Sequence, residues 1–183
     1  MTAKPPPRLP LIDAPEDGLA REEFGKLASG GGILNLHRMM AHAPALMKAS
    51  GGLAAAFRHA AELGRDVTEI VVLRTAQIAG CDYVFRRHVP LARAAGVTDQ
   101  QIGEIRHWRE SSVFSSAQKA ALGFAEDAAQ GDSADDATFA LLRQYFSPRE
   151  IVELTMLVGH YVSTAIFIKT LAVPDETPQT GAE

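Results

Sequence analysis

The sequence predicts an all-α protein built around one helical domain. Helix start signals recur along the chain. In each of them, a side chain that can accept a hydrogen bond from the free backbone N–H groups of a helix start is followed three residues later by an acidic or amide side chain. Glycines end the apolar stretches between these signals. No window alternates apolar and polar residues for long enough to indicate a strand. With 183 residues, 46% of them hydrophobic, the chain is too short for two ordinary domains.

Residues 1–17 contain five prolines and few candidates for a core, which predicts an extended N-terminal arm. Residues 174–183 are expected to form a flexible tail, which leaves residues 18–173 as the helical domain. The helices expected within this domain cover residues 19–28, 37–49, 53–63, 67–79, 82–95, 99–109, 116–130, 134–145 and 148–171.

Each expected boundary depends on a local signal. Five start signals of the capping-box type begin at Asp66, Thr98, Ser115, Ser133 and Ser147. Pro148 strengthens the last of them, because the first helical position needs no backbone N–H. The expected ends or breaks lie at Gly51-Gly52, Gly80, Gly96 and Gly131.

Two segments echo each other, since Glu69-Ile-Val-Val-Leu73 and Glu150-Ile-Val-Glu-Leu154 each open a long apolar helix after a start signal. This echo raises the hypothesis of a duplicated helical unit.

Composition excludes several classes of function. The net charge of −4 comes from acidic and basic residues mixed along the chain, so no basic stripe favours nucleic acid. Cys81 is the single cysteine, which excludes an intrachain disulfide. The first residues lack the apolar segment of a signal peptide, so a cytoplasmic protein is expected.

The segment 151–173 is apolar enough to suggest a membrane span, but it contains Glu153, His160 and Lys169, which are costly in hydrocarbon. We therefore expect a helix buried in protein and no membrane partner. Its apolar run exceeds what one amphipathic face needs, which predicts that its far side meets another subunit.

The residues with the clearest chemistry lie around Gly80. If a helix starts after this glycine, Cys81, Val84 and His88 fall at i, i+3 and i+7 and share one face. Cys81 would lie at the helix N-terminus, where free amides favour a thiolate. A break at Gly80 would also let the preceding helix turn back and bring Glu69 toward His88.

This spacing resembles that of the AhpD-like proteins of the carboxymuconolactone decarboxylase and alkyl hydroperoxidase D superfamily. Their pattern is a glutamate, eleven residues, a CxxC pair, three residues and a histidine, and the chain matches it at Glu69, Cys81 and His88, with Val84 at the second cysteine. The similarity extends over residues 20–173. It implies an AhpD-like helical orthogonal bundle that assembles as a homo-oligomer, either a dimer, a trimer or a hexamer.

The departures from the family patterns bear on the chemistry. Without a second cysteine, the dithiol–disulfide cycle implied by the AhpD resemblance cannot run within this chain. The same segment is also similar to the pattern of the decarboxylase branch, which in many members is Tyr-Glu-Trp, two residues and His. Tyr83, the aromatic Phe85 and His88 match this pattern, but Val84 replaces the inner glutamate.

We therefore expect an enzyme that needs no cofactor or metal and acts by acid–base chemistry, a lyase or isomerase acting on a small carboxylated or lactone intermediate of aromatic degradation. His88 would be the general acid or base, because histidine titrates near neutrality. Glu69 would orient it, and Cys81 would line the pocket. The alternatives are a peroxidase in which Cys81 works with an external thiol, and an inactive oligomeric binding scaffold.

The remaining substrate-binding candidates are Tyr83, Arg74, His160, Tyr161 and His42. An arginine would anchor a carboxylate, and Arg74, Arg86 and Arg87 are the candidates for this role. Each candidate also has a purely structural interpretation. Glu69 could simply close a helix start, and His160 with Tyr161 could be a hydrogen-bonded buried pair.

Overall fold

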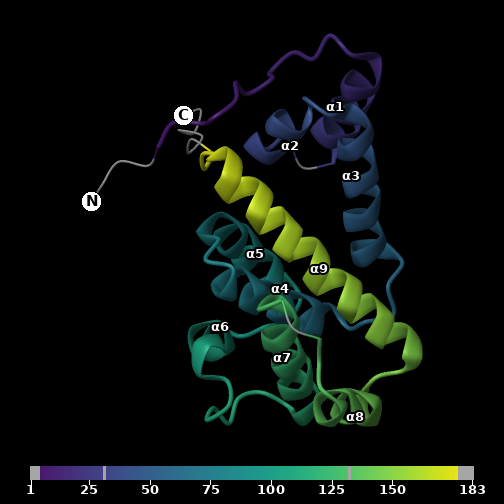
Figure 1. Ribbon diagram of the computed structural model, residues 1–183, viewed down its shortest axis with the longest axis vertical. Coiled ribbons are helices and arrows are strands. Elements are labelled where there is room, and N and C mark those ends of the chain that lie inside the picture. The colour runs from purple at the N-terminus through teal and green to yellow at the C-terminus, as the bar shows by residue number, and fades with distance from the viewer. Residues whose placement is uncertain (1–4, 31, 132, 177–183) are drawn as a thin grey trace. The chain divides into compact units, whose positions relative to one another are not determined.

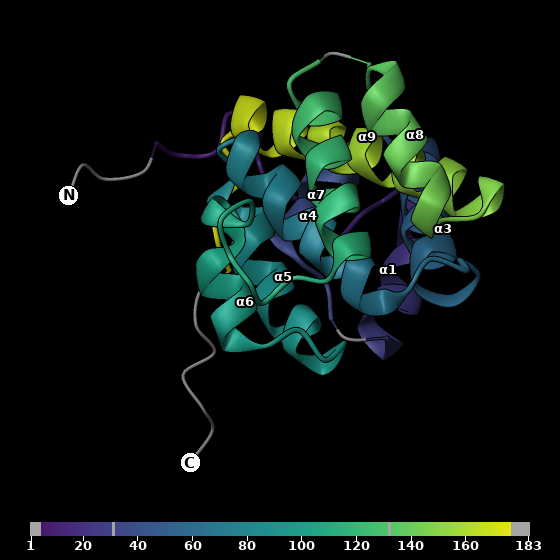
Figure 2. The same cartoon turned by 90° about the horizontal axis from the view of Figure 1, so that it is seen from below.

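The structure is a computed structural model that describes residues 5–30, 32–131 and 133–176. Within these ranges the chain forms helices and loops and no strand, which confirms the all-α prediction (Figures 1 and 2). The elements are α1 (Gly18–Ser29), α2 (Asn35–Met40), α3 (Pro44–His59), α4 (Arg65–Ile78), α5 (Asp82–Ala94), α6 (Asp99–Glu104), η1 (Ile105–His107), α7 (Ser116–Ala129), α8 (Asp136–Tyr145) and α9 (Pro148–Leu171).

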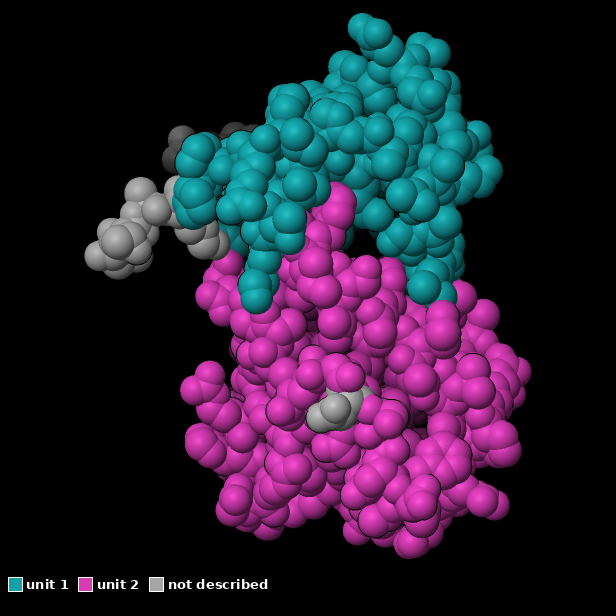
Figure 3. Space-filling view, viewed as in Figure 1, with its two compact units in different colours: residues 1–55, 168–183 teal, residues 56–167 magenta. Residues whose placement is uncertain are grey.

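The chain divides into two compact units, one of residues 1–55 with 168–183 and one of residues 56–167 (Figure 3). Their boundaries fall inside α3 and α9. The arm, domain and tail expected from the sequence stay predictions, and part of that arm and most of that tail lie outside the described residues.

The first unit has its own small core, in which Phe24 of α1 and Met47 of α3 are buried. The proline-rich segment before α1 is fastened to this unit. The backbone N–H of Ile12 donates to the carbonyl of Arg38 at 3.3 Å, and the guanidinium of Arg38 lies 2.8 Å from the Asp13 carboxylate.

The second unit is organised by α4, which packs against both α5 and α7 (Figures 1 and 2). Apolar side chains from these helices and the η1 region form its core. The buried members are Ile70, Leu73, Ala92, Val97, Ile105, Trp108, Phe114 and Leu122.

Gly80 ends α4 as the sequence predicted. Its φ of +60° is a left-handed conformation that glycine adopts without a Cβ penalty. The N–H of Cys81 then donates to the carbonyl of Ala76 at 2.9 Å, the bond that closes a Schellman-type helix end. The chain can therefore reverse within three residues and start α5 at Asp82.

The predicted break at Gly51-Gly52 is wrong, because α3 runs through both glycines without interruption. The break lies earlier, between α2 and α3, where Pro44 occupies the first position of the new helix. A side chain at either glycine would meet nothing within 4 Å, so these exposed positions lower helix propensity without forcing a turn.

Two of the five predicted start signals are also wrong. α4 begins one residue before Asp66, after Gly64. α8 is capped by Asp135, whose side chain accepts from the N–H of Thr138 at 2.7 Å, and not by Ser133. The boxes at positions 98, 115 and 147 are confirmed by their paired hydrogen bonds.

The duplication hypothesis is not confirmed. Glu150 closes the start of α9 by accepting from the N–H of Ser147 at 2.8 Å, whereas Glu69 bonds no N–H at the start of α4 and uses both oxygens elsewhere. The two similar segments therefore place their glutamates in different roles.

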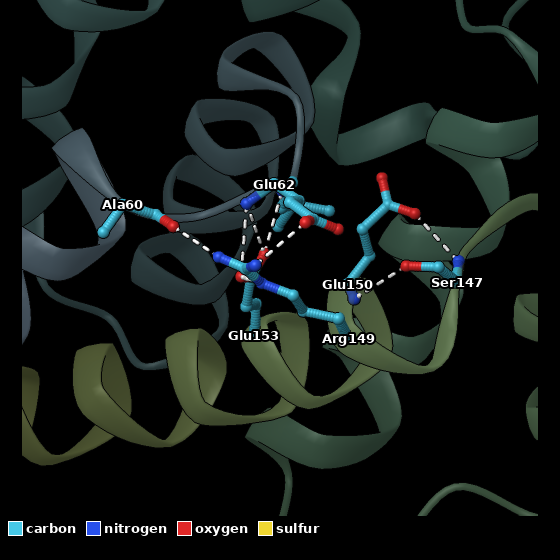
Figure 4. A network of polar contacts seen from close by, with 7 residues as sticks. Ala60, Glu62, Ser147, Arg149, Glu150 and Glu153 are labelled. Atoms are coloured by element: carbon cyan, nitrogen blue, oxygen red, sulfur yellow. Dashed lines mark hydrogen bonds and ion pairs between the residues drawn. The ribbon is translucent and has the colours of Figure 1, made fainter.

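A polar network ties α9 to the loop that leads into α4 (Figure 4). The Glu153 carboxylate accepts from the backbone N–H groups of Glu62 and Leu63, both at 2.9 Å. Arg149 donates to Glu153 at 2.9 Å and to the carbonyl of Ala60 at 2.7 Å. The loop before α4 is thus held in place by side chains of α9.

By length and composition, α9 could cross a membrane. Its polar residues are nevertheless used within the protein: Glu153 holds the loop before α4, and His160 packs against Phe57.

Candidate active site

A buried carboxylate lies at the centre of the candidate site. Glu69, on the second turn of α4, has a side chain that is only 2% exposed. Its Oε2 lies 2.7 Å from Nδ1 of His88 on α5, and its Oε1 accepts from Nη2 of Arg65 at 2.6 Å. Both oxygens therefore have a partner, as burial of a charged carboxylate requires.

The local sequence explains why Glu69 and His88 meet. Glu69 lies eleven residues before Gly80, and His88 lies eight residues after it. Since the chain reverses at this glycine and α4 packs against α5, both side chains lie a similar distance from the turn. The prediction that this break brings Glu69 toward His88 is confirmed by the 2.7 Å contact.

An aromatic ring packs against the imidazole of His88, which is 14% exposed. The Tyr161 ring meets it edge to face, with centroids 4.9 Å apart and planes at 88°. His160 packs against Tyr161 at 5.2 Å and against Phe57 at 5.8 Å. α9 therefore supplies an aromatic wall beside the pair formed by α4 and α5.

The wall residues are held in their neutral forms. Burial, followed by the nearby charges of His88 and Arg58, lowers the pKa of His160 below its usual value. Burial and the neighbouring Glu69 carboxylate raise the pKa of Tyr161 well above its usual value, against smaller opposite effects of Arg58 and Arg65. Near neutral pH, His160 and Tyr161 are thus uncharged surroundings for the Glu69–His88 pair.

His88 keeps one nitrogen available for chemistry. Nδ1 is engaged by Glu69, and within the described ranges Nε2 has no hydrogen-bond partner among the protein's own groups. A histidine whose Nδ1 faces a carboxylate is fixed in orientation and tautomer, and its Nε2 can accept or deliver a proton. The arrangement can therefore perform general acid–base chemistry.

Cys81 is 2% exposed and is the residue that immediately precedes α5. Tyr83 and Val84, on the first turn of that helix, are also buried. Cys81 therefore occupies the predicted position at the helix N-terminus, in an enclosed environment.

Two predicted binding residues have partners elsewhere. The Arg74 guanidinium pairs with the buried Glu126 of α7 and also donates to Gln77. His42 belongs to the first unit, where its Nε2 lies 2.8 Å from the carbonyl of Pro10. Of the predicted residues, the structure therefore brings together Glu69, His88, His160 and Tyr161.

Arg65 was not among the predicted site residues, although it holds Glu69 directly. The sequence carries a usable signal, because Arg65 and Glu69 are spaced i and i+4, the separation at which opposite charges meet on a helix. No group of three or more His, Cys, Asp or Glu side chains among the described residues could hold a metal ion.

Comparison with known proteins agrees with this picture. The model of the carboxymuconolactone decarboxylase family matches residues 41–127, a range that includes Glu69, Cys81 and His88. The uncharacterized protein YnjA of Escherichia coli is 27% identical over 181 residues, which cover 95% of this chain and 93% of YnjA.

Solved structures show the same fold. A protein of unknown function from Agrobacterium tumefaciens, a candidate antioxidant defence protein AhpD, is 26% identical with a TM-score of 0.69, over 75% of this chain and 95% of that one. A peroxidase-related protein with an alkylhydroperoxidase AhpD core from Ralstonia eutropha has a TM-score of 0.81 at 18% identity, over 95% and 94% of the two chains. The AhpD-like fold expected from the sequence is confirmed.

Proposed function

We propose that this chain, which belongs to the carboxymuconolactone decarboxylase family of AhpD-like proteins, is an acid–base enzyme that works without a cofactor. The observation that carries the proposal is the 2.7 Å contact between Nδ1 of His88 and the buried Glu69 carboxylate. The substrate class is a small carboxylated or lactone compound, and the reaction is of the lyase or isomerase type.

The residues divide the work in a simple way. With Nδ1–H donating to Glu69, Nε2 of a neutral His88 can remove a proton from a carbon next to a carbonyl, and the electron pair moves to the carbonyl oxygen. In a decarboxylation the ring starts with a proton taken from solvent. The carbon–carbon bond breaks, carbon dioxide leaves, the electron pair moves to the carbonyl oxygen, and Nε2–H gives its proton to the carbon of the resulting enolate. In both directions Glu69 is the group that stabilises the protonated imidazole.

Solvent-proton incorporation tests this function directly. We would incubate the protein in deuterium oxide with carboxymuconolactone and a panel of related lactone acids, and follow carbon-bound deuterium by mass spectrometry. We expect His88→Gln to reduce incorporation by roughly 10²–10⁴-fold, the usual contribution of a positioned acid or base, and Glu69→Gln to reduce it by less, because the imidazole is still present. Incorporation that is unchanged in His88→Gln would exclude His88 as the acid–base group.

A peroxidase that uses Cys81 is the second candidate, favoured by the position of this residue at the N-terminus of α5. Its burial and the lack of a second cysteine weigh against it. Thiol-dependent consumption of a hydroperoxide that is lost in Cys81→Ser but kept in His88→Gln would favour the peroxidase. If both variants behaved like the wild type with every metabolite and hydroperoxide, the protein would be better described as an inactive scaffold.

We also propose that the protein assembles with copies of itself through α9. Val152, Met156 and Ile166 are 63%, 51% and 62% exposed, and their spacing places them on one face of this helix. An exposed apolar face of this kind is typical of protein interfaces. Light scattering should show a smaller particle for Met156→Glu than for the wild type; an unchanged mass in the double variant Met156→Glu with Ile166→Glu would contradict this assembly.

A further inference from the structure

Arg65 connects the buried acid–base pair to the surface. Its Nη2 donates to Oε1 of Glu69 at 2.6 Å, and its side chain is 39% exposed although Glu69 is only 2% exposed. A guanidinium carries five N–H donors in a planar fork. Among the residues that the structure describes, Glu69 is its one hydrogen-bond partner, so most of the fork is available to a ligand.

The exposed part of Arg65 lines an open depression of about 390 Å³. The other lining residues are Leu91, Ala94 and Ala95, from the last turn of α5 and its end. Leu91 follows His88 by three residues and therefore lies on the same face of α5, one turn further on. The depression thus combines one cation with an apolar surface and begins one helical turn from the acid–base residue.

Two arginines act on the aromatic wall beside His88. Arg58 and Arg65 both act to lower the pKa of Tyr161, and Arg58 contributes to the lowered pKa of His160. Arg58 and Arg65 therefore both act on the aromatic wall beside His88, and Arg65 is at the same time the partner of Glu69. A planar guanidinium fork can bind a carboxylate, as it can a phosphate, through two parallel hydrogen bonds.

We propose that Arg65 is the substrate anchor: it binds the carboxylate of a small acid whose apolar body lies against Leu91, Ala94 and Ala95, while its Nη2 keeps Glu69 oriented toward His88. This inference rests on the proposed acid–base function and makes it more specific, because it identifies the substrate as a small compound that carries a carboxylate beside an apolar body. It also assigns to Arg65 the anchoring role for which the sequence suggested Arg74.

Benzoate is a suitable probe, with neutral benzamide as its isosteric control. Isothermal titration should show benzoate binding to the wild type, and binding weakened roughly 10- to 100-fold in Arg65→Gln, the effect of losing a charge-assisted hydrogen bond. Arg65→Lys should retain part of the affinity. Arg106→Gln removes an exposed charge from η1 and should bind benzoate like the wild type.

A second variant guards against a merely structural effect at Arg65. Ala94→Phe fills the depression without touching the Arg65–Glu69 bond, and should weaken benzoate binding while the far-UV circular dichroism and melting temperature stay close to wild type. A purely structural role for Arg65 would change benzoate and benzamide binding equally, so selective loss of benzoate is the deciding observation. Equal benzoate affinity in wild type and Arg65→Gln, or no benzoate binding to the wild type, would overturn the proposal.

The anchor and the acid–base function can fail separately. His88→Gln should still bind benzoate, because the anchor does not use the imidazole. Arg65-dependent benzoate binding without solvent-proton incorporation would leave the anchor standing and refute the acid–base function. Solvent-proton incorporation that requires His88, with the same substrate KM in Arg65→Gln as in the wild type, would support the acid–base function and refute the anchor.

Discussion

The strength of the Glu69–His88 contact can be measured by a double-mutant cycle on folding stability. Glu69→Gln keeps the shape of the side chain but removes its charge, and His88→Gln removes the ring. The contact is 2.7 Å long and its carboxylate is 2% exposed, so solvent screens it little. Hydrogen bonds to charged groups under such conditions contribute about 1.5–3 kcal/mol.

Each single substitution should lower the free energy of unfolding by less than the removal of one partner from a fully buried ion pair does. Removing one partner of such a pair costs about 3–5 kcal/mol, because a charge is left buried without a partner. In Glu69→Gln the group left behind is Arg65, which is 39% exposed and can recover water. We therefore expect each single variant to lose about 2–3 kcal/mol and the coupling energy to be about 1–2 kcal/mol.

Urea unfolding followed by far-UV circular dichroism at pH 7 gives the four free energies of the cycle. His107→Gln, an exposed histidine of η1, is the matched control and should change stability by less than about 0.5 kcal/mol. Strictly additive losses in Glu69→Gln and His88→Gln, with no coupling energy, would refute the interpretation of these two residues as one unit.

Three further predictions concern the carboxylates that hold the second unit together. Glu126→Gln should lower the free energy of unfolding in urea by about 2–3 kcal/mol. The buried carboxylate accepts a hydrogen bond from the indole N–H of Trp108 at 2.9 Å and pairs with Arg74 and Arg109. A loss of stability no larger than that of Arg109→Gln would contradict this prediction. Burial raises the pKa of Glu126, but the hydrogen bonds from these three donors outweigh burial and hold that pKa below 4.5. The ionised carboxylate therefore stabilises the fold fully above pH 4.5, and this stabilisation is lost as the pH falls through the pKa of the folded state. The gap in melting temperature between wild type and Glu126→Gln should therefore narrow as acid is added; a constant gap would count against it. Glu153→Gln weakens the acceptor of two backbone N–H groups and should cost about 1–2 kcal/mol, measured in the same way.

The sequence predicted the meeting of Glu69 and His88 because the deciding signal is local. A glycine that ends one helix and allows the next to start fixes the reversal of the chain, and Gly80 has the positive φ that such a turn needs. Once the turn is fixed, the distance of each residue from it determines which side chains face each other. The family spacing from Glu69 to His88 reflects this geometry.

Arg65 was missed because of an error of two residues in one helix boundary. Asp66 looked like the cap of α4, which placed Arg65 outside the helix and Glu69 inside a capping box. The helix actually begins at Arg65 after Gly64, so Arg65 and Glu69 are one turn apart on the same face. A small shift in the start of a helix therefore changed the role assigned to both residues.

The misplacement of Arg74 has a different cause, because its partner is distant in the sequence. Arg74 follows Glu69 by five residues, which turns it by about 140° around the helix from that glutamate. On that side it meets Glu126 of α7, 52 residues away. A single sequence shows that a charge exists but not which helix will neutralise it, so this pairing could be found only in three dimensions.

Val84 is the residue that favours the proposed acid–base chemistry over redox chemistry. It is 4% exposed and lies one turn before His88 on α5, at a rise of about 6 Å along the helix axis, whereas Cys81 lies at about 10 Å. The position from which a thiol could most readily exchange a proton with His88 is therefore occupied by a side chain that cannot ionise. The polar partners of the imidazole and of its carboxylate come instead from α4, where Glu69 binds His88 on one oxygen and Arg65 on the other. Glu69 therefore orients His88 and is itself held by Arg65, the proposed substrate anchor. A carboxylate that binds Arg65 is thus connected to His88 through Glu69 alone.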